Sequence, residues 1–182
     1  MNRSDFDLIH NVNAGKHFYQ FYKSQDDYLQ IMAKFFRAGL EKGEACIWLV
    51  SDKIGVPQAK LFADTMIPRF LYYFSSNQFV IRSAQEWYLT NEKFDEEKSL
   101  RNASEFVEGA IKKGYHRIRG SGDAASVPRE EWPKLEAYEH KVDTVIQAAP
   151  VLAVCAYPIL DCTLKETKMV LECHDDVLVG HL

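Results

Sequence analysis

The connection between the first apolar segment and the first helix is the feature that most constrains this chain. Residues 17–22 have the composition of a buried strand, and the apolar residues of 28–40 recur every three or four positions, as on a helix with one buried face. The connection, residues 23–27 (KSQDD), has no glycine and ends in Asp26 and Asp27. A nucleotide-binding domain would place a glycine-rich turn here, so that backbone N–H groups and the helix N-terminus face phosphate. The two carboxylates favour the helix and repel an anion. The order of elements therefore resembles a nucleotide-binding fold that cannot hold a triphosphate.

Strands and helices continue to alternate along the chain. Residues 45–50 are continuously apolar, which is typical of a strand covered on both faces. A second helical stripe runs from Leu100 to Ile111, ends at Lys112-Lys113-Gly114, and precedes a strand predicted over 115–119. Further helices are predicted over 57–66, 132–149 and 163–172, and further strands over 79–81, 151–157 and 177–179. We therefore predict an α/β fold in three layers, with a mostly parallel central sheet and helices on both faces.

The chain reads as one domain. No linker rich in Gly, Ser or Pro divides its 182 residues, and this length is sufficient for a full hydrophobic core. We expect residues 1–15 to form a polar N-terminal arm outside the core and residues 16–182 to form the domain. Because the chain stops soon after the last predicted strand, a fragment of a longer signalling protein is one expectation.

Charge and cysteine content narrow the classes of partner. A formal net charge of −4 gives no electrostatic reason to expect binding to nucleic acid or to an anionic membrane. No segment resembles a secretion signal, and no apolar run approaches the roughly 20 residues of a membrane helix. The 4 cysteines form no CxxC pair. The sequence predicts a reduced, cytoplasmic protein without a membrane or nucleic-acid partner.

Ligand sites in such sheets form at the carboxyl ends of the strands. The residues expected there are mostly aromatic or acidic, which suits a neutral or cationic small ligand better than a phosphorylated one. The candidate ligand-binding residues are Tyr22, Lys23, Asp52, Trp87, Tyr88, Gly122, Asp123 and Tyr157. Residues 120–123 (GSGD) are interpreted as a glycine turn leaving a strand, because they lack the rest of a phosphate-binding motif.

Neither catalysis nor a metal is expected. No serine lies in a G-x-S-x-G elbow. His17 begins a strand and should lie at the amino end of the sheet, away from the site, as a structural residue. Only Cys173 and His174 are adjacent among possible metal ligands, and Cys155 in an apolar strand is interpreted as an inert buried thiol. The glutamates of the long helix, Glu130, Glu131, Glu136 and Glu139, are expected to face water. The sequence thus predicts no catalytic residue, no metal and no cofactor.

Several short segments resemble one family, and they occur in the same order along the chain. They are residues 17–22 followed by a long helix and 43–50 (GEACIWLV), 86–89 (EWYL) with Phe94-Asp95, 114–115 with 117–119 (RIR), 155–157 (CAY), and 174–178 (HDDVL). This set covers about residues 16–180 and resembles the MEDS domain, a methanogen/methylotroph sensory domain first described in a regulator of dichloromethane metabolism.

The resemblance implies a fold similar to the core of RecA- and KaiC-like ATPases, with the phosphate loop lost. Such domains are thought to sense small hydrocarbon-derived ligands, alone or attached to histidine-kinase or DNA-binding transcriptional modules. After Gly122-Asp123 the family tends to have an aromatic residue, usually Trp, where this chain has Ala124-Ala125-Ser126. The resemblance therefore implies an altered ligand specificity or a degraded site.

The leading hypothesis is a non-catalytic cytoplasmic sensor that relays a signal to a partner or fused output module, with a homodimer as one option. An alternative is a degenerate RecA-like nucleotide binder or ATPase that uses Gly122 and Asp123, with Lys23 or Arg119 as the only candidate cations near phosphate. A third is an interaction scaffold whose crevice is filled by side chains.

Overall fold

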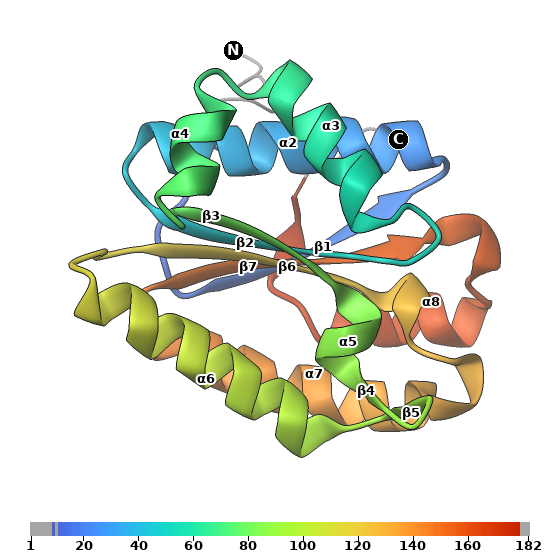
Figure 1. The fold of residues 1–182 in the computed structure, drawn as a ribbon. Coiled ribbons are helices and arrows are strands. Elements are labelled where there is room, and N and C mark those ends of the chain that lie inside the picture. The colour runs from blue at the N-terminus through green and yellow to red at the C-terminus, as the bar shows by residue number, and fades with distance from the viewer. Residues whose placement is uncertain (1–8, 10, 179–182) are drawn as a thin grey trace, which may run out of the picture.

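The computed structural model describes residue 9 and residues 11–178 and shows a central parallel sheet between two layers of helices (Figure 1). The six strands of this sheet are ordered β3-β2-β6-β7-β1-β8, and every neighbouring pair is parallel. Their bounds are β1 Lys16–Tyr22, β2 Ala45–Val50, β3 Phe79–Ser83, β6 Ile118–Asp123, β7 Val151–Pro158 and β8 Asp176–Val177. The predicted three-layer α/β fold is confirmed.

Helices cover both faces of the sheet, as Figure 1 shows. One face carries α2 Gln25–Glu41, α3 Val56–Met66 and α4 Phe70–Ser75. The opposite face carries α5 Ala84–Tyr88, α6 Glu96–Lys112, α7 Trp132–Gln147 and α8 Leu164–Glu172. A hairpin of β4 Leu89–Thr90 and β5 Lys93–Phe94 joins α5 to α6, and short 3₁₀ turns occupy 124–126, 129–131 and 159–161.

The α2 face of the sheet holds a dense aromatic core. Trp48 of β2 lies parallel to Phe79 and packs against Phe36 of α2, and all three rings are almost fully buried. The Trp48 indole donates to the hydroxyl of Tyr28, 2.8 Å away, which satisfies a polar group that burial would otherwise leave unpaired. Nine residues of α2 are buried, so this helix is fixed firmly to the sheet.

Most predicted elements are present, but some boundaries differ. The strand predicted over 115–119 begins at Ile118 and continues to Asp123, so the prediction that residues 120–123 form a turn is wrong. Helices α4 and α5 were not predicted. Ile9, within the expected arm, is buried in the core, whereas residues 1–8 and 10, like Val179 of the last predicted strand, lie outside the described residues.

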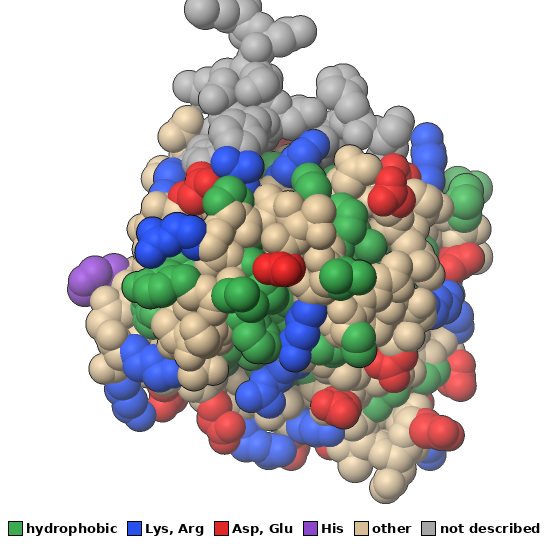
Figure 2. Space-filling view, turned by 45° about the horizontal axis from the view of Figure 1, so that its top comes forward, with side chains coloured by type: hydrophobic (Ala, Val, Ile, Leu, Met, Phe, Trp, Pro, Cys, Tyr) green, Lys and Arg blue, Asp and Glu red, His purple; other side chains and the backbone are tan. Residues whose placement is uncertain are grey.

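The surface over α3 and α4 carries hydrophobic side chains interspersed with charged ones (Figure 2). Leu61, Leu71 and Tyr72 are more than half exposed. Among the described residues, no helix combines the length and apolar character that a membrane span requires.

Candidate functional site

The connection between β1 and α2 satisfies some of its backbone N–H groups with its own side chains. Ser24 caps α2 by accepting a hydrogen bond from the Asp27 amide at 3.1 Å, and the Asp27 carboxylate accepts one from the Ser24 amide at 3.2 Å. This capping box engages donors that a phosphate loop would offer to its ligand. Lys23 is exposed beside it. The turn therefore caps its own helix, and α2 has the acidic first turn that its sequence predicts.

Arg119, the other candidate cation, is engaged inside the core. Its guanidinium is fully buried, forms an ion pair with Glu44, and donates to the carbonyl of Phe35 at 3.0 Å. Arg117 reaches the second oxygen of Glu44 at 3.2 Å. A buried charge needs this compensation, so Arg119 is held away from any ligand at the opposite sheet face.

The glycines of β6 leave part of one sheet face without side chains. Residues alternate along a strand, and Arg119 and Asp123 contact the α2 side through Glu44 and Tyr22. The opposite face therefore receives Ile118, Gly120 and Gly122. Ala153 of β7 pairs with Gly120, which adds a further small residue at the same level. These small residues leave room between the sheet and the helices below it.

That room is an apolar cavity of about 430 Å³ between the sheet, α6 and α7. Such a volume lies within the usual range of small-molecule sites. Its walls are mainly aliphatic and aromatic, with Tyr88 and Trp87 of α5 at one side. The principal lining residues are Ile47, Leu49, Ile118 and Val151 from the sheet, Leu100, Phe106 and Val107 from α6, and Val142 and Ile146 from α7.

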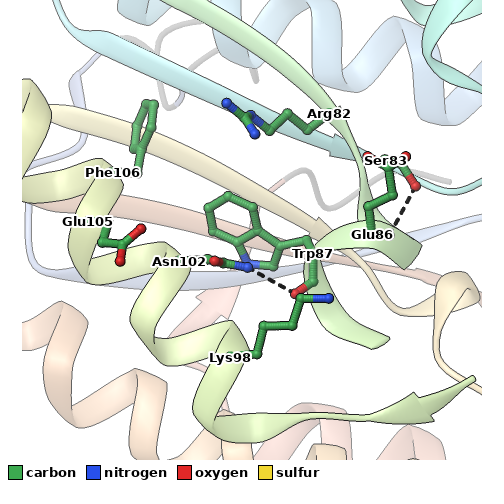
Figure 3. Close-up of a pocket in the computed structure, with 8 residues that line it drawn as sticks. All are labelled: Arg82, Ser83, Glu86, Trp87, Lys98, Asn102, Glu105 and Phe106. Atoms are coloured by element: carbon green, nitrogen blue, oxygen red, sulfur yellow. Dashed lines mark hydrogen bonds between the residues drawn. The ribbon is translucent and has the colours of Figure 1, made fainter. Parts of the chain in front are cut away.

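A more polar pocket of about 410 Å³ adjoins this cavity (Figure 3). Trp87 and Phe106 line both spaces. Asn102 of α6 donates to the Trp87 carbonyl at 3.2 Å, which ties α5 to α6 beside the pocket. The charged residues around the pocket are Arg82, Glu86, Lys98 and Glu105. The pocket thus forms a mixed-charge rim next to an apolar interior.

The structure divides the predicted site residues into separate groups. Trp87, Tyr88 and Gly122 line the apolar cavity. Tyr22 and Asp123 form a buried pair on the α2 side, with the tyrosine hydroxyl donating to the carboxylate at 3.2 Å. Two further members are exposed, namely Lys23 and Asp52, and Asp52 accepts from Ser83 at 2.9 Å. Tyr157 is fully buried and belongs to a third group.

This third group is a buried cluster of His17, Glu139, Cys155 and His174. The His17 Nε2 atom lies 3.3 Å from Cys155 Sγ and 3.5 Å from Glu139 Oε2. Tyr157 donates to Glu139 Oε1 at 3.1 Å. The expectation that Glu139 faces water is wrong, because its side chain is only 3% exposed.

Burial determines the charge of this cluster. Burial raises the pKa of Glu139 to about 7, and it lowers the pKa of His174 to about 4. Burial and the neighbouring His174 also hold the pKa of His17 well below its usual value. Burial, together with Glu139, raises the pKa of the Cys155 thiol. Both imidazoles are therefore neutral near pH 7.

Sequence reasoning missed two features of the site. His17 does lie near the start of β1, but its side chain lines the cavity and the cluster, contrary to the expectation that it lies away from the site. The cavity itself follows from Gly120, Gly122 and Ala153 lying side by side on one sheet face. The alternation of residues through 118–123 was the available signal, and interpreting that segment as a turn concealed it.

Comparison with models of protein families matches residues 16–175 to MEDS, the MEthanogen/methylotroph, DcmR Sensory domain. No curated protein matches the chain. Among solved structures, flagellar accessory protein FlaH from Methanocaldococcus jannaschii is similar at a TM-score of 0.64 and 9% identity, covering 96% of this chain and 75% of FlaH.

KaiC-like protein PH0186 from Pyrococcus horikoshii OT3 is also similar, with a TM-score of 0.64 and 14% identity over 88% of this chain and 68% of that protein. At these identities the likeness establishes the fold alone, which is RecA/KaiC-like. The family match spans nearly the whole sheet, from the first residue of β1 to Asp175 just before β8. The chain therefore belongs to the MEDS family of sensory domains.

Proposed function

We propose that this protein senses a small, largely apolar molecule, of the hydrocarbon-derived kind, in the cavity between the sheet, α6 and α7. The observation that carries the proposal is the cavity of about 430 Å³, whose lining is mainly aliphatic and aromatic. Apolar pockets of this size with a few polar groups are the usual form of small-molecule sites. The pocket of Figure 3 shares Trp87 and Phe106 with this cavity and would be the side from which a ligand enters.

A nucleotide would fit this protein less well than a small apolar molecule. The β1–α2 turn satisfies its own donors through Ser24 and Asp27, and Arg119 is committed to Glu44. Phosphate recognition needs free backbone donors or cations at such a position. We therefore propose a non-catalytic role.

The signal would pass through α6. Only Ser99 and Ala110 of this helix are buried, so a ligand beneath α6 would add packing contacts to it. A change in the position or stability of α6 would then be read by a partner protein or a fused output module, such as a histidine kinase or a transcriptional regulator, with a homodimer as one arrangement. The four free cysteines are consistent with a reducing, cytoplasmic location.

Calorimetric titration of the whole chain tests the ligand site. The titrants are a panel of small alcohols, halogenated hydrocarbons and aromatics, with Mg-ATP as a separate arm. Gly120→Val fills the cavity, because a Cβ on Gly120 faces Ile47 at a permissive 3.6 Å. Gly109→Val is the matched control, since no atom lies within 4 Å of a Cβ at that glycine.

The proposal predicts that members of the apolar panel bind the wild type and Gly109→Val, and that Gly120→Val loses this binding at unchanged fold. Binding of Mg-ATP alone would contradict the proposal. Equal binding of the apolar ligand by both glycine variants would show that the ligand lies elsewhere.

A further inference from the structure

We infer that His17, Glu139, Cys155 and His174 bind one divalent transition-metal ion, with zinc as the ion that best suits these donors. Each residue offers one ligand atom, and the four atoms all lie within 4.8 Å of one another. Two imidazoles, one thiolate and one carboxylate are a donor set that zinc prefers. This inference does not depend on the identity of the sensed ligand.

Four distances between donor atoms lie at or near the values of a tetrahedral site. Metal–ligand bonds of zinc imply donor–donor separations of roughly 3.3–3.8 Å at tetrahedral angles. The Cys155 Sγ atom lies 3.3 Å from His17 Nε2 and 3.5 Å from Glu139 Oε2. Glu139 Oε2 lies 3.5 Å from His17 Nε2 and 3.9 Å from His174 Nε2. All four donor atoms lie within 4.8 Å of one another, so an ion at the centre requires the side chains to move closer together.

The atoms of these side chains that would not touch the metal lie near second partners, which orient the coordinating atoms. His174 Nδ1 lies 2.7 Å from the carbonyl of Val170, so this nitrogen carries the proton and Nε2 offers its lone pair. His17 Nδ1 lies 3.6 Å from the Asp143 carboxylate, and Tyr157 donates to the outer oxygen of Glu139. Metal-binding histidines and carboxylates are typically supported by such second contacts.

A purely structural polar cluster explains the arrangement less well. His174 Nε2 is buried and has no hydrogen-bond partner among the described residues. Buried polar atoms are normally paired, because an unpaired one costs about 1–3 kcal/mol. A metal ion at the centre of the cluster would satisfy His174 Nε2 together with the other three ligand atoms.

The site also has an entry route. His17 and Cys155 line the apolar cavity as well as the cluster, so the ion can enter from that side. Binding would form a metal–sulfur bond and release the thiol proton of Cys155 to solvent, without any change of oxidation state. The bound ion would then lie at the wall of the proposed ligand cavity.

The test uses the whole chain without an affinity tag, first treated with a chelator and then titrated with Zn²⁺ and with Co²⁺. The inference predicts one ion per chain, a rise in the thermal midpoint with Zn²⁺, and a Co²⁺ spectrum with sulfur-to-metal charge transfer and intense tetrahedral visible bands. The spectrum of the wild type reports thiolate coordination without requiring any variant to fold. Absence of saturable binding, or a Co²⁺ spectrum without the sulfur band, would overturn the inference.

Substitutions inside and outside the cluster test where the ion binds. Cys155→Ser and His174→Gln are expected to weaken binding by on the order of 100-fold or more, with loss of the sulfur band in Cys155→Ser. Cys162→Ser and His116→Gln are the matched controls outside the cluster and should bind as the wild type does. Tyr157→Phe removes only the contact to Glu139 and should weaken binding roughly 10- to 100-fold while keeping the sulfur band. Unchanged binding in both Cys155→Ser and His174→Gln would place the ion elsewhere and contradict the inference.

Discussion

At the scale of single residues, two glycines of the helices have opposite roles. Gly39 of α2 allows Arg119 to approach the helix, since a Cβ there would lie 2.6 Å from the Arg119 Cδ atom and 2.9 Å from the Glu44 carboxylate. Gly109 of α6 has nothing within 4 Å of its Cβ position. The same substitution should therefore change stability in different directions at the two positions.

We predict that Gly39→Ala lowers the free energy of unfolding by about 2 kcal/mol, because it overpacks the helix against a buried ion pair. Gly109→Ala should raise it by up to about 1 kcal/mol, the usual gain of alanine over glycine in a helix. Urea denaturation of both variants measures the difference. A stabilised Gly39→Ala would contradict the packing described for Arg119.

At the scale of elements, the two capping boxes can be compared directly. Ser24 with Asp27 begins α2, and Thr163 with Glu166 begins α8. We predict that Ser24→Ala and Thr163→Ala each lower the free energy of unfolding by about 1 kcal/mol, because each leaves a helix N–H without its acceptor. Urea denaturation checks both values. If Ser24→Ala had no effect, the β1–α2 turn would not be held by its cap.

Helices α2 and α6 have the same length but differ in packing. Nine residues of α2 are buried, compared with only Ser99 and Ala110 in α6. We predict that backbone amides of α6 exchange with solvent faster than those of α2, and that a bound apolar ligand slows exchange in α6 selectively. Hydrogen exchange followed by mass spectrometry measures this. Equal ligand-induced protection of the two helices would argue against α6 as the element that responds.

The elements differ in how well sequence predicts them. Residues 45–50 and 151–157 are continuous apolar runs, and both are strands of the buried parallel sheet. The segment 120–123 was mistaken for a turn because glycine weakens strands, yet β2 and β7 on either side hold it in the sheet. The ladder partners that decide this case are distant in sequence.

At the scale of the whole molecule, tertiary structure creates both candidate sites. The cluster joins residues from β1, α7, β7 and the segment that follows α8, and the spacing from His17 to His174 matches no local metal motif. The capping of the β1–α2 turn, by contrast, was readable from adjacent residues. Local chemistry could be predicted, whereas the cavity and the cluster depend on which strands become neighbours.

The cavity beneath β6 is the proposed site of the sensed molecule. The most direct test is native mass spectrometry of the wild type and Gly120→Val purified from the natural host. We expect a small apolar organic molecule to be bound to the wild type and to Gly109→Val, and to be absent from Gly120→Val. A nucleotide bound to the wild type, or the same molecule bound equally by Gly120→Val, would show that this cavity is not the sensing site.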